Sequence, residues 1–140
     1  MRLRAASCIA VAVAACAVFG TTAKPASPNT TGRLTGLTQI TYGCPGPQRV
    51  GQQCERWLTF ARARFAVARN GADGKPIPTT RRAVVSDRNG HFSLVLAAGS
   101  YTITPLAQAH TNGGRPLTAR VRAGQATRIT VRFLGYPMMV

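Results

Sequence analysis

Residues 84–105 constrain the fold of this chain more than any other segment, because they combine apolar alternation with turn signals. The turn signal at residues 87–90 is Asp-Arg-Asn-Gly, whose glycine can adopt the positive φ that tight turns require. Phe92, Leu94 and Leu96 then recur with a period of two, which is typical of a half-buried strand. A second glycine-containing turn follows before the alternation resumes. The segment predicts three consecutive strands joined by tight turns, a β-meander.

The same alternation occurs on both sides of this segment, and no stretch of the folded part has a helical period. The last two alternating runs are separated by Gly124-Gln125, which predicts a terminal hairpin. Strands at short spacing with turn signals between them indicate an all-β fold. We expect a single seven-stranded antiparallel β-sandwich, with strands over residues 34–42, 62–69, 77–86, 91–96, 101–105, 117–123 and 128–133.

One pattern in the central segment resembles a known group of domains. The chain reads D-x-x-G-x-F-x-L-x-L followed by G-x-Y-x-I, carried by Asp87, Gly90, Phe92, Leu94, Leu96, Gly99, Tyr101 and Ile103. Over residues 32–135 it resembles the transthyretin-like group, which includes carboxypeptidase regulatory-like domains and the B-repeat domains of bacterial surface adhesins. The resemblance implies a transthyretin-like sandwich that serves as an accessory, adhesive or spacer module.

A Lys–Asn isopeptide crosslink, which adhesin B-repeats often carry, does not fit this chain. The chain has only two lysines, Lys24 in a predicted spacer and Lys75 in a predicted turn, and its one glutamate is Glu55. We therefore expect no crosslink of this kind.

The N-terminus reads as an export signal followed by a spacer. Two arginines precede a run of small apolar residues that is too short to span a bilayer, and small residues follow it. Residues 1–23 are the predicted signal peptide, 24–32 a Pro/Ser/Thr-rich spacer, 33–135 the sandwich domain and 136–140 a tail. The stretch that ends at Cys16 also resembles a bacterial lipobox. The mature protein is therefore either soluble, in the periplasm or medium, or a lipoprotein anchored through Cys16.

The predicted domain contains two cysteines, Cys44 and Cys54, on either side of a Pro/Gly-rich loop. In an oxidising compartment such a pair most simply forms a disulfide, worth about 3 kcal/mol by loop-closure arithmetic. Neither histidine, His91 or His110, is close to the pair in sequence, and the CxxC spacing typical of metal and redox sites is absent. We expect no metal and no cofactor.

Charge is the strongest compositional signal: 18 Lys and Arg face only 3 Asp and Glu, a formal net charge of +15. This excess favours anionic partners, and arginine suits carboxylate and phosphate. In the predicted hairpin, cross-strand neighbours would place Arg120, Arg122, Arg128 and Arg132 in one cluster. We predict a binding surface made of these four with Arg62 and Arg64. The alternative is a solvated polar face.

Catalysis is not expected, because the three acidic residues fall in separate segments and no nucleophile motif is present. The sequence favours a non-catalytic exported binding module. Its expected partners are an anionic lipid, lipopolysaccharide, an acidic polymer or an envelope protein; nucleic acid fits an exported protein poorly. The alternative function is an accessory subunit that docks a protein partner through a sheet edge, which high salt would leave intact.

Overall fold

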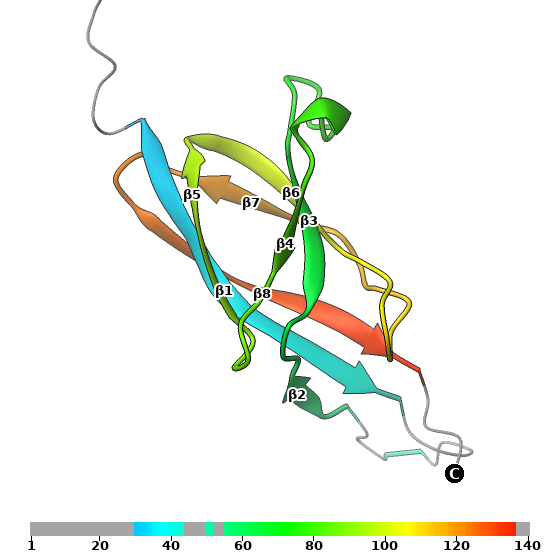
Figure 1. Ribbon diagram of the computed structural model, residues 1–140. Coiled ribbons are helices and arrows are strands. Elements are labelled where there is room, and N and C mark those ends of the chain that lie inside the picture. Colours follow the sequence, from blue (N-terminus) through cyan, green and yellow to red (C-terminus); the bar gives the residue numbers. More distant parts are fainter. Residues whose placement is uncertain (1–29, 44–49, 52–54, 137–140) are drawn as a thin grey trace, which may run out of the picture.

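The strands lie in two stacked sheets, which confirms the predicted all-β class (Figure 1). The computed structural model describes residues 30–43, 50–51 and 55–136. Within these residues there are eight strands and one short 3-10 helix: β1 (Thr31–Tyr42), β2 (Trp57–Thr59), β3 (Arg64–Arg69), η1 (Pro78–Thr80), β4 (Arg82–Val85), β5 (His91–Ala97), β6 (Gly99–Pro105), β7 (Leu117–Val121) and β8 (Ala126–Gly135).

The first sheet, here called sheet A, is built around β1. On one side β1 pairs with β8 in parallel, from Arg33 opposite Ala126 to Tyr42 opposite Gly135. On its other side the first half of β1 pairs antiparallel with β5, and its last residues pair antiparallel with β2. The parallel pair makes sheet A mixed, so the prediction of a purely antiparallel sandwich is wrong.

The second sheet, sheet B, has the strand order β4-β3-β6-β7, and all of its pairs are antiparallel. β3 and β6 are therefore its inner strands, and β4 and β7 are its edges. Sheet B packs across sheet A, with the hydrophobic core between the two layers (Figure 1).

The predicted meander and terminal hairpin have the right strands but the wrong pairing. β5 lies in sheet A, whereas the strands before and after it, β4 and β6, lie in sheet B. β7 and β8 likewise belong to different sheets. The reason is physical: alternation specifies which side chains are buried, and an inward side chain is buried equally well from either layer of a sandwich.

Several strand boundaries differ from the prediction, and three of the differences have a local explanation. β1 begins at Thr31, so the last two residues of the predicted spacer belong to the sheet. β2 is an additional strand, and three residues are too few to show alternation. β4 begins only at Arg82, because prolines at 76 and 78 cannot donate to a ladder and residues 78–80 form η1 instead.

The core is filled by inward-facing aromatic and branched side chains. Leu34, Phe65 and Phe133 are fully buried. Phe60 packs edge-on against Phe133, with ring centroids 5.0 Å apart, and Phe65 lies 4.8 Å from Phe92. Pairs of this geometry add about 0.5–1.5 kcal/mol to the burial of their area. The Phe65–Phe92 contact joins the two sheets, because Phe65 comes from sheet B and Phe92 from sheet A. The Phe60–Phe133 contact joins the β2–β3 connection to sheet A.

A small polar cluster inside the sandwich connects β1 to the segments that cross between the sheets. The Thr38 Oγ1 atom lies 2.6 Å from the Phe60 carbonyl, 2.9 Å from Ser86 Oγ and 3.0 Å from the Gly90 carbonyl. Ser86 Oγ also accepts a hydrogen bond from the Ala63 N–H, at 2.9 Å. Phe60 lies in the β2–β3 connection and Ser86 in the β4–β5 connection. The Thr38 hydroxyl therefore connects β1 to both the β2–β3 and the β4–β5 connection.

Replacing Thr38 with valine should destabilise the protein by about 1–3 kcal/mol, because buried polar partners lose their hydrogen bond while the shape is kept. Urea unfolding followed by circular dichroism measures this change. The matched control is Thr35→Val on the outward face of the same strand, which should stay within about 0.5 kcal/mol of the parent. Equal free energies of unfolding for the two variants would contradict a structural role for the Thr38 hydroxyl.

Candidate binding surface

The four arginines of the predicted hairpin do not form one cluster. In β7, Ala119 and Val121 point into the core, so Arg120 points outward from sheet B. In β8, Val131 and Phe133 are the buried residues, so the arginines beside them point outward from sheet A. The outer faces of the two sheets look in opposite directions. The predicted cluster is therefore divided between them, with Arg120 on sheet B, Arg122 just after β7, and Arg128 and Arg132 on sheet A.

The other two predicted arginines are also separated. Arg64 begins β3 and is exposed on sheet B, where its strand neighbour across the ladder is Val85. Arg62 is not on the strand: it lies in the preceding turn with φ of 51°, and its N–H donates to the Asp87 carbonyl at 2.9 Å. Arg64 and Arg120 pair with residues near opposite ends of sheet B.

Sheet A brings two of the predicted arginines, Arg128 and Arg132, together with Arg33, which the sequence did not single out. Arg33 points outward from β1 and lies opposite Ala126 of β8, one outward position away from Arg128. Diagonal neighbours of this kind are about 7–8 Å apart, within reach of long side chains. Arg132 continues the row along β8. We call Arg33, Arg128, Arg132 and Trp57 the basic face.

Trp57 belongs to the basic face through β2. It pairs with Thr41 of β1, and the Arg132 guanidinium carbon lies 4.8 Å from the centroid of its ring. This is cation–π geometry, worth about 0.5–1 kcal/mol where it is exposed. The pairing of β2 with β1 creates this cation–π contact. In the sequence, the only signal of a polar outer face on β1 was that Arg33, Thr35 and Gln39 alternate with the residues that are buried.

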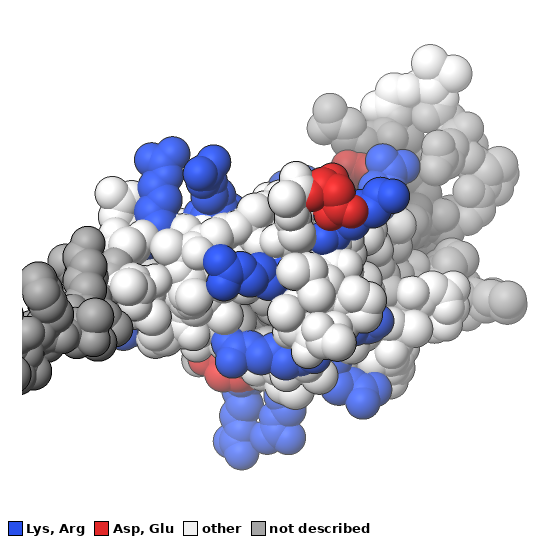
Figure 2. Space-filling view, turned by 90° about the horizontal axis from the view of Figure 1, so that it is seen from above, with Lys and Arg blue, Asp and Glu red and all other residues white. Residues whose placement is uncertain are grey.

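Positive charge is not confined to the basic face. Figure 2 shows lysine and arginine side chains on opposite sides of the molecule and also between them, interspersed with uncharged surface. The basic face differs from the other positions in having three arginines and an aromatic ring on one sheet face. It is the best candidate for a specific anion contact among the residues that the structure describes.

The side chains of the two described aspartates bind the backbone of their own turns. Asp87 Oδ1 accepts hydrogen bonds from the backbone N–H groups of Asn89 and His91, both at 2.8 Å. Asp73 Oδ1 accepts one from the Lys75 N–H at 3.1 Å. Their carboxylates therefore stabilise loop geometry.

His91 and His110 are both exposed, and they lie on different elements, β5 and the β6–β7 loop. Over residues 30–43, 50–51 and 55–136, no three His, Cys, Asp or Glu side chains gather where they could hold a metal ion. Cys16, Cys44 and Cys54 lie outside the described residues. The arginines remain the side chains best suited to hold a ligand.

Comparison with solved structures shows a fold shared with two bacterial pilins and with a third bacterial protein. The minor pilin of Streptococcus agalactiae has a TM-score of 0.54 and 15% identity, over 79% of this chain and 47% of the pilin. A streptococcal ancillary pilin has a TM-score of 0.53 and 12% identity, over 78% and 34%. The Bacillus anthracis TIE protein has a TM-score of 0.50 and 12% identity, over 76% and 17%. This chain thus spans less than half of each of these proteins, and the likeness is one of fold.

Neither a protein-family model nor a curated protein sequence matches the chain. In the part of the chain that the structure describes, no helix is long and apolar enough to cross a membrane.

The Arg132–Trp57 contact should be measurable as a coupling free energy. A double-mutant cycle of Arg132→Gln and Trp57→Leu, followed by urea unfolding, should give about 0.5–1 kcal/mol of coupling. The same cycle with Arg128→Gln is the control, because Arg128 is on the same strand and face but has no stacking contact with the ring. Coupling near zero in both cycles would show that the stack does not persist in solution.

Proposed function

We propose that this protein is an exported, non-catalytic accessory module of a bacterial cell surface, with a transthyretin-like sandwich related to adhesin B-repeats. Two of the similar solved structures are pilins, and the D-x-x-G-x-F-x-L-x-L pattern supports the same relationship. The course of the chain suits a spacer role. β1 and β8 run in parallel, so residues 30 and 136 lie at opposite ends of the sandwich (Figure 1).

The ligand that we propose is an anionic polymer, bound at the basic face. This proposal rests on the observation that Arg33, Arg128 and Arg132 share one sheet face with Trp57. Guanidinium groups present planar donors that match carboxylate and phosphate. Arg128 and Arg132 are four residues apart on one strand, or roughly 13 Å at the rise of a strand. A row of this length suits repeated charges, such as those of an acidic surface polymer, an anionic membrane or lipopolysaccharide.

A second candidate function is docking of a protein partner through a sheet edge. The observation that favours it is the free edge of β5, which pairs only with β1 among the described residues. Electrostatic binding at the basic face weakens with salt, whereas strand pairing and apolar contacts persist.

The proposed export route and covalent features lie outside the described residues: cleavage after residue 23, lipidation at Cys16 and the Cys44–Cys54 disulfide. Export as a soluble protein predicts a mature chain that starts at Lys24; lipidation predicts one that starts at Cys16 and carries acyl groups. Intact mass of the protein from its native host distinguishes the two. Alkylation with and without prior reduction should label Cys44 and Cys54 only after reduction, and labelling without reductant would refute the disulfide.

Polymer binding should depend steeply on salt and on the basic face. The triple variant Arg33→Gln, Arg128→Gln, Arg132→Gln should lower the slope of log K against log salt by about 2, since each lost phosphate-type contact removes about 0.7–0.9. The measurement is retention on immobilised polyphosphate and on phosphatidylglycerol vesicles over about 50–200 mM salt.

The matched control neutralises three arginines elsewhere: Arg64→Gln, Arg120→Gln and Arg122→Gln. It has the same net charge as the triple variant but keeps the basic face. Equal slopes for the two triple variants would mean that binding follows net charge alone, and would remove the basic face as a site. Retention on polyphosphate without retention on vesicles would identify a polymer as the source of the phosphate.

A further inference from the structure

β5 is an unusually unprotected edge strand. Its seven residues, His91–Ala97, contain no Asp, Glu, Lys, Arg or Pro, and Val95 is 60% exposed. In natural sheets, charged residues, proline, a short strand or a covering loop normally prevent such edges from pairing with another chain. Both edges of sheet B have such protection: β4 has only four residues and begins with exposed Arg82, and the Arg120 carbonyl in β7 accepts a hydrogen bond from the Thr127 hydroxyl. In sheet A, β8 carries exposed Arg128 and Arg132, and β2 has only three residues.

The hydrogen-bond alternation shows which backbone groups of β5 are free. At one end of the β1–β5 pairing Thr38 N–H donates to the Gly90 carbonyl, and at the other Ala98 N–H donates to the Thr30 carbonyl. Antiparallel residues bond to the partner strand alternately. The even-numbered residues of β5 therefore bond to β1, and the odd-numbered residues direct their N–H and C=O groups to the open side.

Asp87 closes one end of this open edge. Its side chain and its backbone N–H bind the N–H and the C=O of His91, each at 2.8 Å. At the other end, the Ala97 carbonyl accepts a hydrogen bond from the Tyr101 hydroxyl at 2.6 Å. The free groups are therefore the N–H and C=O of Ser93 and Val95 and the N–H of Ala97, and this stretch spans about 13 Å at the rise of a strand. This is enough for a partner strand of about five residues.

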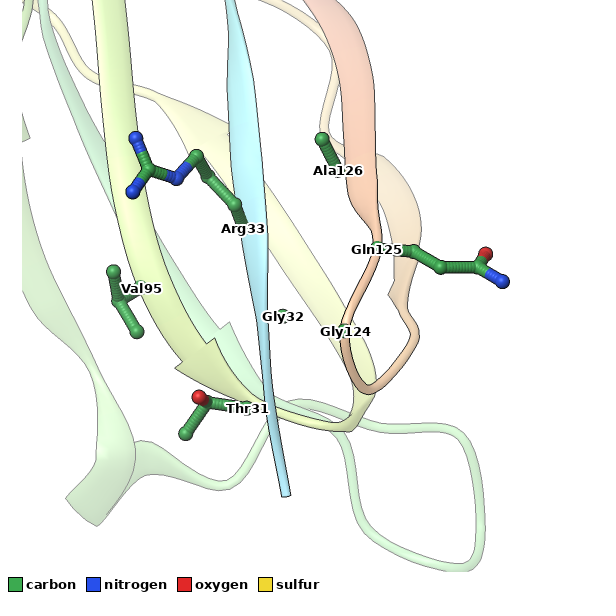
Figure 3. Close-up of a pocket in the computed structure, with 7 residues that line it drawn as sticks. All are labelled: Thr31, Gly32, Arg33, Val95, Gly124, Gln125 and Ala126. Atoms are coloured by element: carbon green, nitrogen blue, oxygen red, sulfur yellow. The ribbon is translucent and has the colours of Figure 1, made fainter. Parts of the chain in front are cut away.

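The surroundings of the edge define what such a strand would carry. On its inner side, a groove of about 420 Å³ separates β5 from β4 and is lined by Val84, Phe92 and Leu94 among others. On its outer side, Figure 3 shows the Arg33 side chain extending from β1 toward β5, on the side where Val95 lies. Because side chains alternate along a strand, an added strand presents apolar residues to the groove and its other residues to Arg33.

We propose that the free edge of β5 is a strand-addition site for an extended segment of a partner protein, in which apolar residues alternate with acidic ones. This inference rests on the second candidate function. A second copy of this chain is the poorer occupant, because a net formal charge of +15 opposes self-association and β5 supplies no acidic residue for Arg33. A segment of alternating apolar and acidic residues would place its acidic side chains near Arg33 and its apolar side chains in the groove.

Amide hydrogen exchange of the intact protein, resolved by NMR, tests the site directly. The probe is a short capped peptide in which valine alternates with glutamate. At a concentration of ten times its Kd, the peptide should slow exchange at Ser93, Val95 and Ala97 by about tenfold, because the bound state protects them. Phe92, Leu94 and Leu96 already bond to β1 and should change little. Slowing without this alternation, or no slowing, would overturn the proposal.

Two variants sharpen the test. Val95→Pro removes an outward N–H without removing a bond to β1, so it should abolish the protection at Ser93 and Ala97. Arg33→Gln leaves the edge intact and should raise the Kd of the peptide by about twofold to fivefold, as expected for an exposed ion pair. A control peptide with lysine in place of glutamate should bind less tightly than the acidic one. Equal Kd values for the two peptides would refute the acidic partner.

The experiment also separates this proposal from polymer binding and from self-association. Val95→Pro should retain the salt-dependent binding to polyphosphate, so either site can fail without the other. Concentration-dependent protection of Ser93, Val95 and Ala97 without peptide, with a dimer mass in sedimentation, would identify a second copy as the occupant and overturn the acidic segment.

Discussion

The hydroxyl of Thr38 is the contact on which the arrangement of the two sheets depends. Its hydrogen bonds join β1 to two of the connections in which the chain leaves one sheet for the other, β2–β3 and β4–β5. A buried hydroxyl without partners is costly, so alternative positions of these connections are disfavoured. The crossing after β4 in turn determines that β5 lies beside β1 and not beside β4. The free edge of β5, the second proposed binding surface, follows from that choice.

β1 is shared by the two proposed surfaces. Its outward Arg33 lies one outward position from Arg128 on the β8 side, and next to Val95 on the β5 side. The same guanidinium is therefore available to a polymer on the basic face and to an acidic strand at the β5 edge. Because one guanidinium cannot neutralise two ligands fully, simultaneous occupation should weaken both contacts, a negative coupling that is reciprocal by linkage.

The positive net charge of the protein offsets the tendency of its uncharged edge strand, β5, to pair with other copies of the chain. An uncharged edge strand of this length invites pairing between identical chains. A net formal charge of +15 opposes that pairing without placing a charge on the edge itself. The edge thus remains open to negatively charged partners, while electrostatic repulsion keeps other copies of the chain away. This selectivity weakens as salt screens the repulsion.

The sequence by itself determined the local features: the all-β class, the turns at Asp73 and Asp87, and which residues of most strands face the core. These follow from side-chain period and turn chemistry, which act over a few residues. It did not reveal β2, whose three residues are too short for a pattern, and it placed four arginines in one hairpin that does not exist. Strand pairing was decided only by the tertiary structure, because an alternating strand can bury its apolar face from either layer. That choice moved Arg120 and Arg122 away from Arg128 and Arg132, brought Arg33 and Trp57 to the basic face, and left β5 with a free edge.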